Sequence, residues 1–227
     1  MTARPTPPSD AQGRLWLAET LWRLGGIQFG DFSLGRTVRN SPVYVNAKLL
    51  ISRPDALKRT IALIAEELEL GMAMRNRTVE PFDVIAGVPI GGLHLATALA
   101  LRLDLPLLYV RPPRVADEVA APHIEGIYRP GQRTLLVDDL AAGGGSLVET
   151  ALALRNAGLM ISDAAVLVDR EQGATPRLEG MGVRLHPILT LEVMLTYLDS
   201  AGHLADGDLD RALAYIHREG EPRSEFD

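Results

Sequence analysis

The chain has 227 residues, 47% of them hydrophobic, and carries a formal net charge of −6 with a pI of about 5.4. This size and composition suit a single domain with a full core, while the acidic balance without a basic run argues against a nucleic-acid partner. The absence of cysteine excludes a disulfide framework and thiolate chemistry, and no apolar run reaches the roughly 18 residues of a membrane span, so we expect a cytoplasmic protein without a membrane partner.

The N-terminal part of the chain contains helical and hairpin patterns. Residues 1–13 are Pro-rich at their start and lack the apolar centre of a signal peptide, so we expect a flexible arm. Apolar residues at helical spacing predict helices over 13–25 and 55–71. Between them, residues 29–51 are typical of a hairpin, with a polar tip at 35–41.

From residue 82 onward, short apolar strands alternate with helices, which predicts an α/β protein with a parallel sheet covered on both faces. Residues 112–133 have no periodicity and are typical of a functional lid or mobile segment, and residues 221–227 are expected to be disordered. The strands are predicted over 82–89, 105–111, 134–140, 163–170 and 184–191, and helices over 91–103, 144–157 and 205–220.

The segment VDDLAAGGGS, residues 137–146, places two acidic residues and a glycine turn after an apolar strand. In open parallel sheets, ligands bind beyond the carboxyl ends of the strands, where Asp138 and Asp139 suit vicinal hydroxyls, a metal or a developing cation. The glycines at 143–145 let backbone N–H groups approach an anion at the positive end of the next helix, and Ser146 adds a hydroxyl. The segment therefore predicts a sugar-phosphate site.

Other interpretations of this turn fit less well. The sequence has neither the Lys-Ser/Thr pair of a Walker P-loop nor the GxGxxG spacing of a dinucleotide-binding turn. A tight turn whose aspartates only cap a helix is the remaining alternative. The combination of acids, glycines and a hydroxyl favours the ligand site.

VDDLAAGGGS resembles the diphosphate-sugar motif of the type I phosphoribosyltransferases, which bind 5-phosphoribosyl 1-diphosphate (PRPP). Further segments are similar to the orotate phosphoribosyltransferase family, and the resemblance covers roughly residues 15–217. These segments are FGDFSL, SPVYVN, GVPIGGLHLATALA, VLVDREQGA and LEVMLTYLDSAG.

The resemblance implies a type I phosphoribosyltransferase fold, with a mostly parallel central sheet flanked by helices. It implies one domain over residues 14–220. Within that domain we expect a small hood from about 14–52 and a mobile loop at about 112–124.

Members of this family join orotate to the ribose of PRPP, giving orotidine 5′-monophosphate and diphosphate in pyrimidine biosynthesis, with Mg²⁺. By resemblance the chain is a pentosyltransferase, and Asp138 and Asp139 act on the ribose hydroxyls. Carboxylates suit an oxocarbenium-like transition state. Mg²⁺ is expected mainly through diphosphate oxygens and water, with no protein metal site. The PRPP-binding set implied is Arg111, Arg114, Asp138, Asp139, Leu140, Ala141, Ala142, Gly143, Gly144, Gly145 and Ser146.

The base-binding residues implied are Arg170, Tyr44 and Ala142. Arg170 matches the arginine that faces the orotate carboxylate, and a planar guanidinium suits a carboxylate; a strand-end salt bridge with Asp169 or Glu171 is the alternative. For Tyr44 an ordinary buried strand position is the alternative.

Gly91 and Gly92 follow the strand at 82–89 and would lie near the diphosphate. Their alternative role is close packing of the helix that they begin.

The chain departs from the family at the loop RPPRVADEVAAPHIEG, 111–126. Arg111 matches, but Pro112 stands where the family has a lysine, and Arg114 replaces a second lysine only with a one-residue slip. Arg111 is therefore the expected catalytic cation, shared across a homodimer. The only lysines in the chain are Lys48 and Lys58, so a lysine-dependent mechanism has few candidates.

The leading hypothesis is orotate phosphoribosyl transfer. Because the loop lacks lysine, and Ala142 replaces a threonine of the family, two alternatives remain: transfer to another base, and a PRPP- or nucleotide-binding regulator without catalysis.

Overall fold

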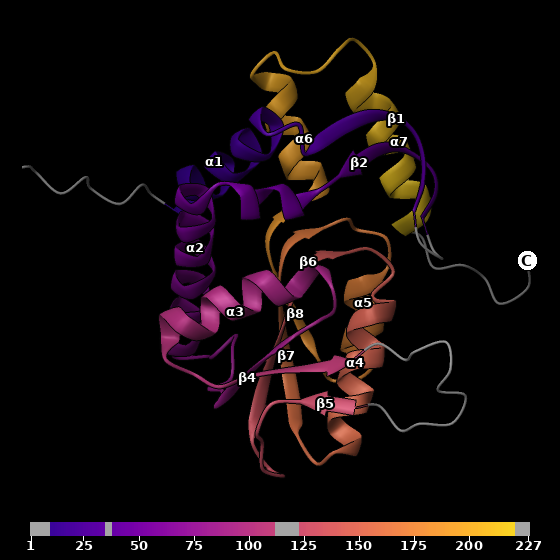
Figure 1. The fold of residues 1–227 in the computed structure, drawn as a ribbon. Helices are drawn as coiled ribbons and strands as arrows, with labels where there is room; N and C mark the ends of the chain where they lie inside the picture. Colours follow the sequence, from indigo (N-terminus) through magenta and orange to yellow (C-terminus); the bar gives the residue numbers. More distant parts are fainter. Residues whose placement is uncertain (1–9, 35–37, 112–122, 221–227) are drawn as a thin grey trace, which may run out of the picture.

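The computed structural model describes residues 10–34, 38–111 and 123–220. Its central sheet has six strands in the order β5-β4-β3-β6-β7-β8, all parallel except for the antiparallel pair β4 and β5 (Figure 1). This confirms the predicted α/β class and mostly parallel sheet. The strands are β3 (Val84–Gly87), β4 (Leu107–Arg111), β5 (His123–Glu125), β6 (Arg133–Ala141), β7 (Met160–Asp169) and β8 (Arg184–Thr190).

Apolar side chains project from both faces of the sheet. Along β6, Leu135 and Val137 pack into one core and Leu136 into a second, because successive strand residues point to opposite faces. Helices α2 and α3 cover the first face, and α4 and α5 cover the second (Figure 1). Their bounds are α2 (Pro54–Ala73), α3 (Gly91–Leu103), α4 (Gly145–Asn156) and α5 (Ala174–Glu179).

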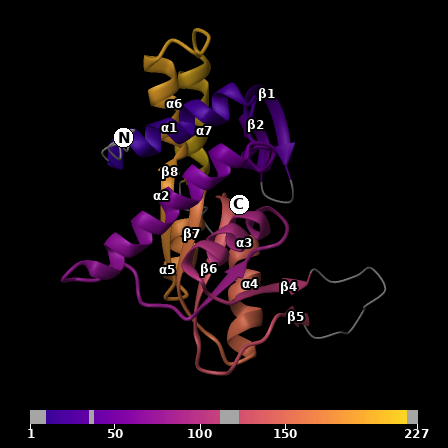
Figure 2. The same ribbon diagram turned by 60° about the vertical axis from the view of Figure 1, so that its left-hand side comes forward.

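A smaller lobe, which we term the hood, lies above the carboxyl edge of the sheet (Figures 1 and 2). Its antiparallel hairpin pairs Ile27 with Val45, which confirms the predicted hairpin. The hood elements are α1 (Asp10–Arg23), β1 (Ile27–Leu34), β2 (Val38–Val45), the short helix η1 (Ala47–Ser52), α6 (Leu191–Ser200) and α7 (Asp208–Gly220).

The C-terminal helices complete the hood, which the sequence placed at 14–52 alone. Helix α6 packs on α1, and α7 packs on β2. His203 beyond α6 contacts the Glu19 carboxylate of α1 at 2.8 Å and stacks on Trp22. The hood therefore needs both ends of the chain.

Several elements differ from the sequence predictions, among them η1 and α6, which the apolar periodicity did not predict as helices. Helix α1 begins at Asp10, inside the expected arm of residues 1–13. Strand β5 occupies 123–125, so the end of the expected mobile loop at 112–124 is paired with β4. Helix α5 was not predicted, because its six residues are too few for a periodic pattern. None of the helices within the described ranges is long and apolar enough to cross a membrane.

Candidate active site

The two predicted aspartates lie near the carboxyl end of β6 and are both buried. Asp138 Oδ1 accepts a hydrogen bond from Asp139 N at 2.8 Å, and Asp139 Oδ1 accepts one from Leu140 N at 3.0 Å. Burial and the neighbouring charge of Asp139 raise the pKa of Asp138 well above its usual value. The two adjacent carboxyl groups are therefore costly to ionise together, and a cation beside them favours their charged form.

Glycines 91 and 92 make the close approach of α3 to β6 possible. A Cβ on Gly91 would lie 2.2 Å from Asp139 Oδ1, and a Cβ on Gly92 would lie 2.1 Å from Val137 O. Real Cβ atoms do not approach so closely, so a side chain at either position would require its neighbour to move: the Asp139 side chain for Gly91 and the strand backbone for Gly92. The packing alternative for this pair is thus supported, and Gly91 in particular leaves the space that the Asp139 carboxylate fills.

The glycine turn leads from β6 into α4. Gly144 adopts φ +71°, in the left-handed region, and precedes the first helical residue, Gly145. A Cβ on Gly144 would lie 3.2 Å from the Cα of Ala174, so α5 packs directly against this turn. The first N–H groups of a helix have no partner within it, and Ser146 is exposed beside them. The turn can therefore hold an anion such as a phosphate.

The tertiary structure adds Arg177 of α5 to this turn. Its Nη1 donates a hydrogen bond to Gly143 O at 3.1 Å, and its side chain is exposed. The sequence analysis missed Arg177, because it lies 34 positions from Gly143 and on a helix that was not predicted.

Arg170, at the end of β7, reaches across to the hood. Its Nη2 donates to Ser41 Oγ at 2.9 Å and to Val43 O at 3.3 Å. The residue is 3% exposed, and burial lowers the pKa of its guanidinium. Within the described ranges, no carboxylate pairs with Arg170 and its Nε has no hydrogen-bond partner.

The strand-end alternative for Arg170 is not observed. Asp169 accepts hydrogen bonds from Glu171 N at 2.9 Å and Thr175 Oγ1 at 3.0 Å, and Glu171 Oε2 accepts one from Glu192 N at 2.9 Å. Both carboxylates are thus used by local backbone and hydroxyl groups. The positive charge of Arg170 is left to face the boundary between sheet and hood.

Tyr44 lies on β2 and is half-buried, with its ring 5.5 Å from that of Phe32. Its phenol lies close enough to Lys48 to affect the pKa of that lysine. Ala142 is half-buried in the turn after β6. Tyr44 therefore lies in the hood, whereas Ala142 lies just after β6 of the central sheet.

Lys48 of η1 is the functional candidate that sequence reasoning missed. Its Nζ lies 2.8 Å from Asp139 Oδ2. Burial opposes the charge on Lys48, but the contact with Asp139 outweighs it, and the pKa of Lys48 lies above its usual value. The scarcity of lysine was a signal, because only Lys48 and Lys58 were available.

The predicted loop cation, Arg111, does not pair with Asp138 or Asp139 in this chain. It lies at the end of β4, which β3 separates from β6, and pairs with Glu125 of β5. That contact lowers the pKa of Glu125. Arg114 lies outside the described residues.

The site fits a divalent metal that arrives with its substrate. Within the described ranges, no three acidic, histidine or cysteine side chains gather as a metal site. Mg²⁺ commonly keeps several waters and binds through substrate phosphates rather than a protein cage. The carboxylate pair and the neighbouring glycine turn are compatible with Mg²⁺ that is held by substrate phosphates and water.

A parallel sheet with an acidic pair and a glycine turn at its carboxyl edge defines a phosphoribosyltransferase domain. The family described as phosphoribosyl transferase domain matches residues 56–182, more than half of the chain. The orotate phosphoribosyltransferase of Chlamydia pneumoniae is 31% identical over 204 residues, which cover 89% of this chain and 92% of that protein. The chain belongs to the orotate phosphoribosyltransferase family.

Solved and longer relatives agree with this assignment. The crystal structure of orotate phosphoribosyltransferase from Aeropyrum pernix superposes with a TM-score of 0.69 at 34% identity, covering 83% of this chain and 99% of that one. The uridine 5′-monophosphate synthase of Bos taurus is 33% identical over 200 residues, 88% of this chain. The chain spans only 40% of the length of that bovine protein.

Proposed function

We propose that the protein transfers the phosphoribosyl group of PRPP to orotate, giving orotidine 5′-monophosphate and diphosphate. In this reaction a ring nitrogen of orotate loses its proton to solvent and forms a bond to C1′ of the ribose, and the bond from C1′ to the diphosphate oxygen breaks. Membership of the orotate phosphoribosyltransferase family supports the reaction class. The charge at Arg170 supports the choice of base.

The observation that carries the proposal is the buried, carboxylate-free guanidinium of Arg170. A buried charge is costly unless it is paired. Orotate differs from uracil by one carboxylate, and a carboxylate is the anion that a planar guanidinium binds best. A base that carries this group would complete the pairing that the described residues leave open.

The other residues have matching roles. Asp138 and Asp139 would bind the ribose hydroxyls and stabilise positive charge at C1′, while the glycine turn and Ser146 would bind the 5′-phosphate. The side chain of Arg177 lies at the same turn, where it adds positive charge. We propose that the diphosphate leaves beside Gly91 and Gly92, at the start of α3.

We propose Mg²⁺ as the metal, held by the diphosphate and water, where it neutralises charge on the leaving group. We also propose a cytoplasmic homodimer in which Arg111 and Arg114 act in the partner's site. Mixing an Arg111→Ala chain with an Asp139→Ala chain tests the sharing. Activity above the sum of the two parents is expected, and recovery no greater than that sum would refute it.

The central test measures orotate and uracil consumption by the pure protein with PRPP and Mg²⁺. We expect turnover of orotate and strong discrimination against uracil. An Arg170→Lys variant should raise KM for orotate by about 10–100-fold, because a hydrogen bond to a charged group contributes roughly 1.5–3 kcal/mol. The same variant should change the weak uracil reaction much less.

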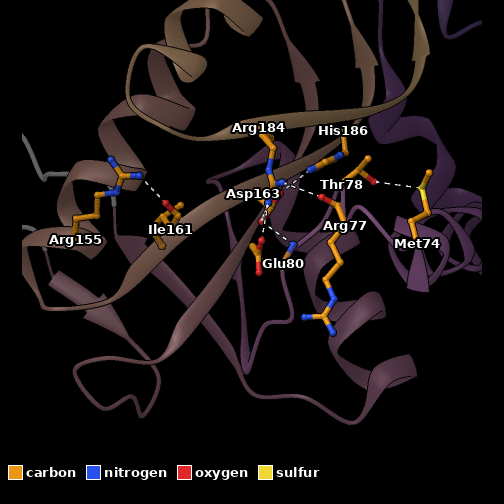
Figure 3. Close-up of polar contacts among 9 residues, drawn as sticks. All are labelled: Met74, Arg77, Thr78, Glu80, Arg155, Ile161, Asp163, Arg184 and His186. Atoms are coloured by element: carbon orange, nitrogen blue, oxygen red, sulfur yellow. Dashed lines mark hydrogen bonds and ion pairs between the residues drawn. The ribbon is translucent and has the colours of Figure 1, made fainter. Parts of the chain in front are cut away.

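Arg155→Lys is the matched control. Arg155 donates to the backbone carbonyls of Met181 and Ile161, the second of which Figure 3 shows, and it lies in the last turn of α4, at the other end of that helix from the glycine turn. It should leave both substrates' KM unchanged. Orotate turnover without loss in Arg170→Lys would contradict the role of Arg170. Turnover of another base but not orotate, or PRPP binding without turnover of any base, would refute the proposed reaction.

A further inference from the structure

One ion pair joins the hood to the reacting edge of the sheet. Lys48 Nζ lies 2.8 Å from Asp139 Oδ2, although the two residues are 91 positions apart in the chain. The Asp139 side chain is 7% exposed and the Lys48 side chain 50% exposed. The aspartate is therefore buried, while half of the lysine side chain is exposed to solvent.

Three groups interact directly with Asp139: Asp138 of β6, Lys48 of η1 and His94 of α3. A fourth group, Tyr44 of β2, interacts with Lys48. His94 Nε2 is buried and, within the described ranges, has no hydrogen-bond partner. Burial lowers the pKa of His94, and the charge of Lys48 lowers it further. Neutral histidine leaves Lys48 as the cation among these four groups.

This charge balance matters because two adjacent carboxylates are buried together. Burial and the charge of Asp139 raise the pKa of Asp138, and the charge of Lys48 opposes that rise. A carboxylate must be ionised to stabilise positive charge at the ribose. A cation at the pair favours the ionised form.

We propose that Lys48 is a positioning residue of phosphoribosyl transfer, which acts through its ion pair by holding the Asp139 carboxylate between hood and sheet. The ammonium has three N–H donors, and half of the side chain is exposed. Lys48 thus also places positive charge on the solvent-exposed side of the acidic pair. This role rests on the proposed function, and it supplies a lysine from the hood to a site whose loop has none.

The experiment compares Lys48→Met, Lys48→Arg and the control Lys58→Met. Lys58 is the only other lysine and is exposed on α2. We expect Lys48→Met to lower kcat/KM for PRPP on the order of 10²-fold, and to lower Tm as well because the buried Asp139 carboxylate loses its cation. Lys48→Arg should recover most of this loss because it keeps the charge. Lys58→Met should match the wild type.

The pH profile separates positioning from a merely structural role. Without the ammonium, the carboxylate pair becomes harder to ionise, so the acidic limb of kcat/KM should move to higher pH by about one unit in Lys48→Met. Lys48→Arg and Lys58→Met should keep the wild-type limb. An unmoved acidic limb in Lys48→Met, or a kcat/KM equal to that of Lys58→Met, would overturn the proposal.

Calorimetric binding of PRPP gives a readout that needs no base. If the wild-type protein bound PRPP without turning over orotate, the proposed reaction would be refuted, but the proposed role of Lys48 would not. The PRPP affinities of the variants would then test the role of Lys48. Weaker PRPP affinity in Lys48→Met, with its pH dependence moved upward, would support the inference, and affinity equal to that of Lys58→Met would refute it.

Discussion

The Asp139 carboxylate fills the space that a side chain at position 91 would need: a Cβ on Gly91 would lie 2.2 Å from Asp139 Oδ1 and 2.5 Å from its Cγ. The first residue of α3 thereby sets where the carboxylate of β6 can lie. Lys48 holds the other carboxylate oxygen at 2.8 Å. The position of Asp139 is thus set from two sides, by the start of a helix and by the hood.

We predict that Gly91→Ala reduces activity more than stability. The added methyl meets the end of a side chain, which can rotate away, so Tm should fall only slightly. A displacement of a reacting group by about 1 Å can lower the rate by roughly 10²-fold, and we expect a loss of that order in kcat/KM. Steady-state kinetics and thermal unfolding of the same preparation measure both effects.

Gly92→Ala is the matched variant. Its methyl would meet the backbone oxygen of Val137 at 2.1 Å, and a strand backbone cannot rotate away. Overpacking of this kind costs about 1–3 kcal/mol, so Gly92→Ala should lower Tm clearly more than Gly91→Ala. Equal activity of Gly91→Ala and wild type would show that Asp139 does not need its observed position.

We predict that Asp138→Asn stabilises the protein while it lowers activity. The pKa of Asp138 is raised above the usual 3.8 by burial and by Asp139. Because the folded pKa is raised, the neutral carboxyl of Asp138 contributes to the stability of the wild type below pH 3.8. This contribution is lost as pH rises through the folded pKa. Asparagine stays neutral, so the variant should have the higher Tm at neutral pH, and the difference should vanish toward pH 3.8.

Thermal unfolding across this pH range provides the measurement. Asp199→Asn, on the exposed side of α6, controls for the loss of one negative charge. A Tm for Asp138→Asn at or below that of wild type at neutral pH would contradict the burial penalty. Activity equal to wild type would contradict a role for the Asp138 charge.

We predict that Asp163→Ala destabilises the protein and leaves its activity unchanged. Asp163 lies near the amino end of β7, and Figure 3 shows its polar contacts. Its carboxylate contacts His186 Nε2 at 2.8 Å and Arg184 Nε at 3.1 Å, and accepts a hydrogen bond from Glu80 N at 3.1 Å. Burial opposes its ionisation, but these bonds outweigh it, and the pKa of Asp163 lies below its usual 3.8. Removing one partner of a buried charged group costs about 3–5 kcal/mol.

Asp163→Ala should therefore lower the free energy of unfolding by about 3–5 kcal/mol at neutral pH. Because the folded pKa is lowered, the contribution of Asp163 is present above pH 3.8 and is lost as pH falls through the folded value. The difference in Tm from wild type should therefore narrow below pH 3.8. Denaturant unfolding measures the loss, and KM for PRPP and orotate should remain at wild-type values. A constant difference in Tm across the acid range would argue against this linkage.

The sequence predicted the architecture because local patterns carry it. Apolar strands that alternate with helices predict a covered parallel sheet, and β6, α3 and α4 lie close to their predicted ranges. The segment 137–146 also identified the acidic pair and the glycine turn, since its members are neighbours in the chain. Arg170 was found by resemblance, at a strand end where ligands of parallel sheets bind.

The contacts that complete the site depend on the tertiary structure. The Lys48–Asp139 pair joins residues 91 positions apart, and the bond from Arg170 to Ser41 spans 129 positions. Arg177 reaches the glycine turn only because α5 packs there. Contacts between residues so far apart in the sequence cannot be predicted from local hydrophobic periodicity.

The sequence by itself thus determined the strands, the helices and the acidic glycine turn of this phosphoribosyltransferase, because hydrophobic period and short motifs are local properties. Only the tertiary structure decided which cation faces the acidic pair of β6. It paired Arg111 with Glu125 on β5 and brought Lys48 to Asp139. The reason is physical: a buried carboxylate is neutralised by the charge nearest in space, and the folding of the hood over the sheet sets that distance.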